Sequence, residues 1–211
     1  SSNTKLARFS VVKNNPRNRD YVKSLVPMIK LIRTPILISE INDSPTKFYE
    51  KFMRILKKHK MGNCGELVKL FNFILDLNGI KAEKGVLCPS DLNHCVSIIP
   101  LKEKAIDKID FKHTPMSKMK DVLIADPWLD IIDYAPNIAA RYKNDSNYSR
   151  FIGDYKKAIN KDSYFPTYNL QDIYLHPKIG SQHPVDEAMR EHFKISNPEL
   201  FIEKGKQLIK H

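Results

Sequence analysis

The strongest apolar repeat of the chain lies in its first half. Apolar side chains recur there at three- and four-residue steps: Leu67, Leu70, Phe71, Ile74 and Leu77. This spacing predicts a helix with one buried face. Gly62 and Gly65 bracket Cys64 directly before the repeat, and Asn78-Gly79 after it is typical of a helix C-terminus. We therefore expect a helix that has Cys64 at its N-terminus.

Two weaker repeats precede this helix. The first starts at Asp20, and its apolar face is Val22, Leu25, Val26, Ile29 and Ile32. Pro27 should kink this helix or delay its start, and Pro35 should lie beyond its end. The second repeat has the apolar face Phe48, Phe52, Ile55 and Leu56, and Ser44-Pro45 supplies its cap and first helical residue. The chain is thus expected to run through two helices into the Cys64 helix.

After the Cys64 helix the pattern changes to short runs with β-branched residues, at positions 81–88, 93–100 and 121–126. A tight connection, Pro89-Ser90-Asp91, predicts a hairpin of the first two runs. If the third run returns antiparallel beside the second, His94 at the start of one lies beside Asp126 at the end of the other. Alternate positions form two rows, His94-Val96-Ile98 and Val122-Ile124-Asp126. We expect both rows to pack on the Cys64 helix.

These elements predict an α+β protein, in which a cysteine-bearing helix packs on a small antiparallel sheet with helical additions at both ends. Residues 1–19 form a polar arm, residues 20–135 the core, and residues 136–211 a mostly helical extension packed on that core. Within the extension, the segments 185–193 and 198–209 are expected to be helical, the latter behind a Ser196 or Asn197 cap.

Composition narrows the class of protein. The 211 residues are 42% hydrophobic and 28% charged, and the longest apolar-looking stretch, 25–38, is broken by charges and prolines, so no transmembrane segment is expected.

Three cysteines, an odd number, favour reduced thiols over a disulfide framework. The net charge of +11 comes from scattered lysines without interleaved aromatics, which favours solubility or steering toward an acidic partner over nucleic-acid binding. Because the chain starts with Ser1, we expect it to have been processed or trimmed.

Cys64, His94 and Asp126 are the groups that thiol hydrolysis needs: a nucleophile, a base that shares its proton, and a carboxylate that orients the base. A helix N-terminus stabilises the thiolate form of Cys64. The backbone N–H of Cys64 and a neighbouring amide are candidate oxyanion donors, with Asn63 a further candidate.

Taken singly, Cys64 could be a buried thiol, His94 a hairpin-end histidine and Asp126 a turn residue. Zinc held by Cys88, His94, Cys95 and Cys64 is an alternative, although adjacent strand residues point to opposite faces.

The motifs resemble a known group of enzymes. Gly62-Asn63-Cys64-Gly65-Glu66, His94 at the head of a strand and Ala125-Asp126-Pro127-Trp128 at the end of another resemble the papain-like and transglutaminase-like cysteine hydrolases of bacterial virulence effectors. The resemblance covers residues 60–130. It implies a papain-like or transglutaminase-like core with a Cys64-His94-Asp126 triad. Gly65 and Trp128 are, like Asn63, candidate oxyanion or substrate-lining residues, and Trp128 is expected to pack over the edge of the site. Cys95 departs from the pattern, since relatives more often carry an apolar residue there.

The same resemblance implies an activity. Deamidation of a glutamine in a host protein is the first expectation, by a protein that bacteria secrete into the reducing cytoplasm of the host cell. Peptide-bond cleavage by an effector protease is the alternative, and an amine in place of water would give transglutamination. A non-catalytic binding module on the same fold is a third option. No cofactor or metal is expected for this chemistry.

Overall fold

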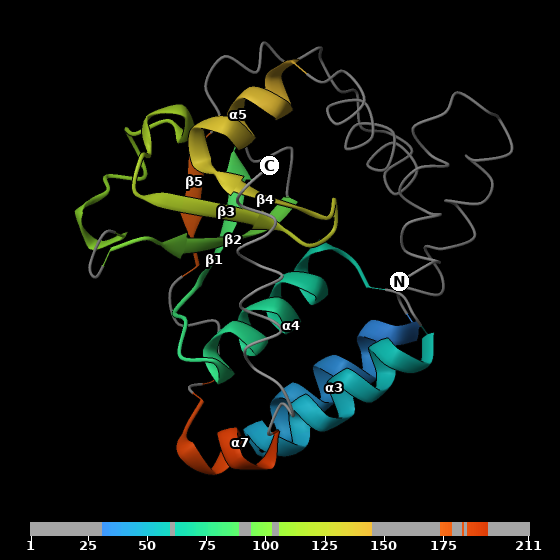
Figure 1. Ribbon diagram of the computed structural model, residues 1–211. Coiled ribbons are helices and arrows are strands. Elements are labelled where there is room, and N and C mark those ends of the chain that lie inside the picture. The colour runs from blue at the N-terminus through green and yellow to red at the C-terminus, as the bar shows by residue number, and fades with distance from the viewer. Residues whose placement is uncertain are drawn as a thin grey trace, which may run out of the picture. The chain divides into compact units, whose positions relative to one another are not determined.

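The computed structural model describes residues 31–59, 62–88, 94–102, 106–144, 174–178, 183 and 185–193. Within them the chain is a mixed α+β protein with a small antiparallel sheet, as predicted, and the sheet has five strands (Figure 1). It divides into two compact units, residues 1–66 with 141–171 and residues 67–140 with 172–211. The arm expected at 1–19 and the helix expected at 198–209 lie outside the described residues.

The first unit contains two described helices. Helix α3 (Pro45–His59) begins at the predicted proline and has Lys57, Lys58 and His59 in its last turn. The other is a helix at residues 31–42, and here the prediction that Pro35 lies beyond the helix end is wrong. Three buried side chains, Ile32, Ile36 and Ser39, form one stripe that continues across the proline. Burial of this stripe outweighs the one hydrogen bond that proline cannot donate.

Helix α4 (Cys64–Leu77) begins at the cysteine, as predicted. Its end also follows the sequence signal. Gly79 adopts a left-handed φ of 75°, and the N–H of Ile80 donates to the carbonyl of Leu75 at 2.9 Å. This closes the last turn in the way that a glycine just past a helix permits.

The sheet has the strand order β4-β3-β2-β1-β5. The three predicted strands are β1 (Glu83–Cys88), β2 (His94–Pro100) and β3 (Val122–Asp126). They pair antiparallel as expected, with Val86 opposite Cys95 and Ser97 opposite Ala125. Two further strands, β4 (Ile131–Tyr134) and β5 (Tyr174–Pro177), extend the sheet at β3 and at β1. The sequence did not predict these two, and β5 brings part of the expected helical extension into the core sheet.

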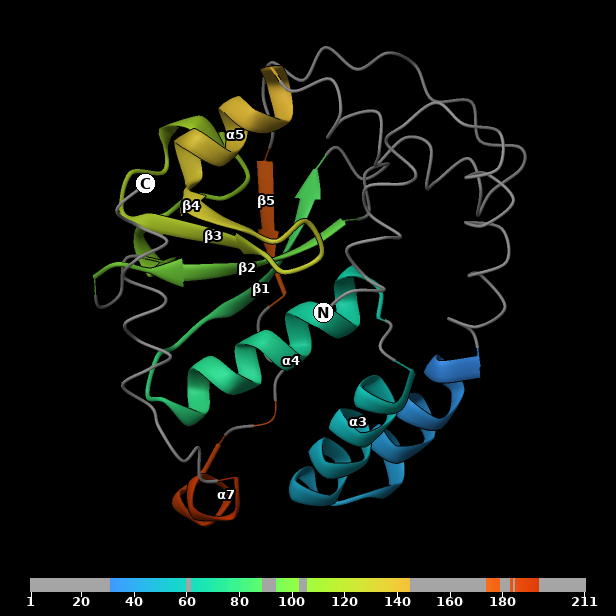
Figure 2. The same ribbon diagram turned by 45° about the vertical axis from the view of Figure 1, so that its right-hand side comes forward.

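Helix α4 and helix α5 (Ala135–Asn144) lie on opposite sides of the sheet (Figure 2). In both views α4 and β2 run in roughly the same direction and β3 runs back. The start of β2 and the end of β3 therefore lie at the same edge of the sheet, as predicted.

The prediction of which row of side chains meets α4 is wrong. Phe71 and Leu75 of α4 pack on a cluster formed by Ala82, Ile99, Leu123 and Ala125, and the Ser97 hydroxyl donates a hydrogen bond to the Asn72 Oδ1. These sheet residues alternate with the row of His94, which therefore belongs to the other face. The small side chains of Ser97 and Ala125 leave room for the helix on their face.

The row of His94 contains bulkier side chains, and one of them packs over a glycine of the adjacent strand β1. Ile98 lies over Gly85 of β1, where an added Cβ would meet its Cδ1 at 2.7 Å. A glycine in β1 thus makes the space that Ile98 fills. Ile98 and Ile124, which are opposite each other in the sheet, are both fully buried.

The loop between β2 and β3 also contributes to the core. It carries two short 3-10 helices, η2 (Ile106–Lys108) and η3 (Met116–Lys118). Met116 is 0% and Met119 2% exposed, although the loop is rich in lysine. Isolated methionines of this kind fill core space without producing a periodic signal.

Helix α7 (Glu187–His192) confirms the helix predicted near 185–193 and lies against α4. The Phe193 and Phe73 rings meet edge-on with centroids 5.0 Å apart, and the Arg190 Nη1 donates to the Leu77 carbonyl at 2.9 Å. Because α4 contacts both the sheet and α7, it is covered on more than the single face that its apolar repeat predicted.

Candidate active site

The turn that carries Cys64 is held by hydrogen bonds from its neighbours. The backbone N–H of Cys64 donates to the Asn63 side-chain Oδ1 at 2.9 Å, and the N–H of Asn63 donates to the Glu66 Oε2 at 3.0 Å. Asn63 is therefore the N-cap of α4, and Glu66 reaches back to it as the third helical residue of a capping box does. The Cys64 N–H, a predicted oxyanion donor, is occupied by Asn63 in this arrangement.

An ion pair extends this network into the helix at residues 31–42. The Arg33 Nε donates to the Glu66 Oε1 at 2.6 Å, and its Nη2 lies 3.5 Å from Oε2. The Glu66 side chain is 12% exposed and that of Arg33 is 44% exposed. All four residues of the network belong to the first unit of the chain.

The second unit contains the other two predicted catalytic residues. His94 Nε2 and Asp126 Oδ2 are 2.5 Å apart, and the two side chains are 3% and 0% exposed. The His94 Nδ1 makes no hydrogen bond to any residue that the structure describes. A carboxylate bound to one ring nitrogen fixes the tautomer of a histidine and leaves the other nitrogen for proton transfer.

The local sequence explains how Asp126 can hold His94. Its second oxygen, Oδ1, accepts the backbone N–H groups of Trp128 at 3.0 Å and Leu129 at 3.1 Å. This is the turn chemistry expected of an aspartate at a strand end, completed by Asp130 in the left-handed region at φ 63°. One oxygen thus organises the turn while the other faces the imidazole.

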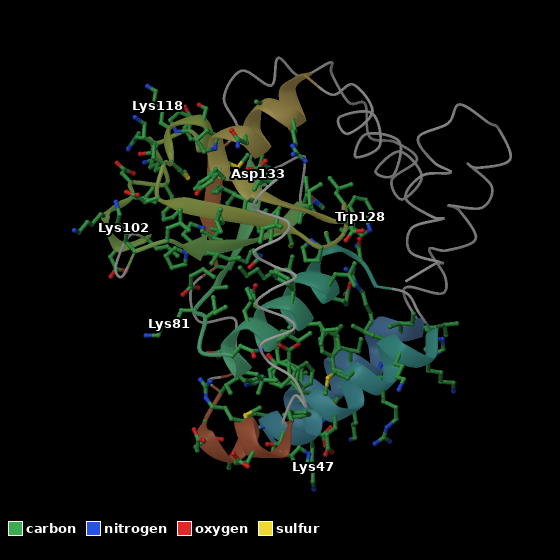
Figure 3. The ribbon with its side chains drawn as sticks, viewed as in Figure 1. Lys47, Lys81, Lys102, Lys118, Trp128 and Asp133 are labelled. Carbon is green, nitrogen blue, oxygen red and sulfur yellow. The ribbon has the colours of Figure 1, made fainter. Side chains whose placement is uncertain are left out.

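Trp128 lies against the imidazole from that same turn. Its ring centroid is 5.1 Å from that of His94, with an angle of 48° between the planes, and the residue is 7% exposed. Figure 3 shows it at the edge of the sheet beyond β3. The ring restricts water around His94, which strengthens the interaction of the imidazole with Asp126.

The predicted residues therefore fall into two groups, one in each unit of the chain. Asn63 and Cys64 form one with Gly65 in the first turn of α4, and His94, Asp126 and Trp128 form the other. Sequence reasoning missed the roles of Arg33 and Glu66. The Glu at the third helical position was a readable capping signal, whereas nothing in the sequence indicated that Arg33 would reach it.

Cys64 shares a face of α4 with Val68 and Asn72. Cys64, Val68 and Asn72 follow one another at four-residue steps and are all buried, and Asn72 is the residue that bonds to Ser97. Helical geometry places side chains at these steps on one face. Cys95, as predicted, alternates with His94 along β2 and is also buried.

The described part of the chain contains no group of three or more histidine, cysteine, aspartate or glutamate residues that could hold a metal ion. Its helices are all too short or too polar to cross a membrane.

Comparisons of the chain with protein-family models, with curated proteins and with solved structures found no match. The class of protein that the fold and site define is therefore a mixed α+β protein with a buried histidine–aspartate pair and a cysteine at a helix N-terminus.

Proposed function

We propose that this protein is a cysteine hydrolase in which Cys64 is the nucleophile, His94 the general base and Asp126 the residue that orients the base. The observation that carries the proposal is the buried bond between the His94 Nε2 and the Asp126 Oδ2 at 2.5 Å. A histidine whose Nε2 is held by a carboxylate is suited to accept a proton at Nδ1.

The proposed pairing of Cys64 with His94 requires the first turn of α4 to meet the start of β2. Asn72 of α4 bonds to Ser97 of β2, three residues after His94, so the later part of α4 is joined to the strand that carries the proposed base.

The alternation of β2 sets a condition on this pairing. His94 lies on the opposite face of β2 from Ser97, so the proposal requires Cys64 to reach His94 at the end of the strand, where His94 is the first residue.

The reaction follows from these roles. The Cys64 thiolate attacks the carbonyl carbon of a glutamine side-chain amide, and the imidazolium of His94 gives its proton to the departing nitrogen, which leaves as ammonia. A water molecule, deprotonated by His94, then attacks the thioester and releases glutamate and the free thiol. The oxyanion of each step would take the Cys64 N–H, so the Asn63 side chain would have to turn away when a substrate binds.

A glutamine of a host protein is the substrate that the resemblance to virulence-effector hydrolases favours. Mass spectrometry of intact candidate substrates tests this choice, because deamidation of one amide adds about one dalton, whereas cleavage of a peptide bond gives fragments. Cys64→Ala should abolish either product. The matched control is Cys95→Ala, which removes another buried thiol of the described chain and should leave product formation unchanged. Product formation by Cys64→Ala would refute the proposal.

A further inference from the structure

Four residues form a continuous chain of contacts that ends at the proposed nucleophile. Arg33 bonds to Glu66 at 2.6 Å, Glu66 accepts the N–H of Asn63 at 3.0 Å, and the Asn63 side chain accepts the N–H of Cys64 at 2.9 Å. The contacts join the helix at residues 31–42 to the first turn of α4. Such a chain fixes the turn geometrically and also brings two opposite charges close to the thiol.

We propose that Glu66 and Arg33 are positioning residues for Cys64: Glu66 fixes the turn, and Arg33 offsets the charge that Glu66 would otherwise place beside the thiolate. This inference rests on the proposed role of Cys64 as a nucleophile. Neither residue touches the reacting atoms, and both act through the capped turn.

The need for Arg33 comes from two opposite effects of Glu66. A carboxylate in the first helical turn favours the helix because it interacts well with the positive end of the helix dipole. The same carboxylate, two residues from Cys64, disfavours a second negative charge on the thiolate. A guanidinium bonded to the carboxylate at 2.6 Å keeps the capping geometry while cancelling most of this repulsion.

Within the described part of the chain, Arg33 is the basic residue that forms an ion pair with Glu66. The basic residues at the end of α3, Lys57, Lys58 and His59, are exposed, and solvent therefore weakens their effect on the thiol. His94 and Asp126 are the charged groups that the proposed triad would add from the sheet. Arg33 is thus the basic group bonded most directly to the network that holds Cys64.

The test measures the alkylation rate of Cys64 by iodoacetamide at pH 6 and at pH 9 in the full chain, with no substrate. Arg33→Met keeps the aliphatic stem and removes the charge. Its rate at pH 6 should fall about two- to fivefold, while the rate at pH 9, where an ordinary thiol is largely ionised, should stay unchanged. The loss at pH 6 should shrink in 0.5 M salt, because the pair is partly exposed.

Lys51→Met is the matched control. Lys51 forms an ion pair of similar length and exposure, 2.7 Å to Asp43, in the same unit of the chain, but it has no link to Cys64. Its alkylation rates should equal those of the wild type at both pH values. Glu66→Gln, which keeps an acceptor for the Asn63 N–H and removes the negative charge, should react at pH 6 at least as fast as the wild type. Glu66→Ala, which loses the acceptor, should react more slowly than Glu66→Gln.

Two results would overturn the inference. One is an Arg33→Met profile identical to that of the wild type, and the other is an equal loss at pH 6 and pH 9, which would indicate only a change in access to the thiol. Failure of the proposed function would give a different result. The wild-type Cys64 would then react at pH 6 as slowly as an ordinary cysteine, whether or not Arg33→Met changed that rate.

Discussion

The imidazole of His94 and the carboxylate of Asp126 lie 2.5 Å apart, although 32 residues separate them in the sequence. The pairing of β2 with β3 produces this relationship, because it sets Ser97 opposite Ala125 and so places the start of one strand beside the end of the other. Both side chains are almost fully buried, so the bond forms in a medium of low dielectric, where it is strong and where loss of either partner is costly.

The variant Asp126→Asn should keep the fold but lose several orders of magnitude in turnover. An asparagine oxygen can still accept the N–H groups of Trp128 and Leu129, so the turn should survive. Its NH₂ group would then face His94 Nε2, which forces that nitrogen to be an acceptor and puts the proton on Nδ1, where it cannot receive the Cys64 proton. Steady-state rates on a validated protein substrate measure this effect. Turnover within about twofold of wild type, a change under ~0.5 kcal/mol, would mean that Asp126 only forms a turn.

Asp126→Ala should also be less stable than the wild type, by about 3 kcal/mol, because it removes the bond to His94 and the two backbone bonds of the turn. Urea unfolding followed by circular dichroism gives this value. If Asp126→Ala were as stable as Asp126→Asn, the turn would not depend on a side-chain oxygen at this position.

Most of the site was predictable because each of its signals is local. A cysteine between glycines ahead of an apolar repeat, a histidine that opens an alternating run and an aspartate before proline all lie within a few residues of the structure that they specify. The nearness of His94 and Asp126 followed from the expected antiparallel return of the third run beside the second.

The remaining features depend on contacts that a local pattern does not carry. The sequence did not reveal which face of β2 meets α4, because both rows are buried and their patterns are alike. The choice is made by Ser97 and Asn72, whose pairing is apparent only in three dimensions. Four-residue strands such as β5 are too short to show periodicity, and Pro35 broke a helix rule because the buried stripe around it continues.

The Asn72–Ser97 hydrogen bond should stabilise the docking of α4 on the sheet. Both residues are 0% exposed, so Ser97→Ala, which leaves the Asn72 amide without this partner, should cost about 1–3 kcal/mol of unfolding free energy. Asn72→Leu alone should cost a similar amount. The double variant should recover most of the lost unfolding free energy, because it leaves neither polar side chain of the pair buried without its partner. Urea unfolding of the three variants measures this, and strictly additive losses would argue against coupling between the two side chains.

Iodoacetamide at mildly acidic pH should label Cys64 ahead of Cys88 and Cys95. The N-terminus of α4 favours the thiolate of Cys64, whereas Cys95 lies within β2 without a helix dipole to stabilise its charge. Peptide mapping after brief labelling gives the order. Equal labelling of all three thiols would favour the non-catalytic binding module.

The measurement that tests the central claim most directly is the rate of Cys64 alkylation as a function of pH, compared between the wild type and His94→Gln. If Cys64 and His94 form a thiolate–imidazolium pair, the wild-type rate should stay high well below the ~8.5 at which a free thiol is half ionised, and His94→Gln should lose that acidic reactivity. Circular dichroism should show that the variant retains the fold. Superimposable pH profiles for the two folded proteins would contradict the pairing of Cys64 with His94, and with it the proposed triad.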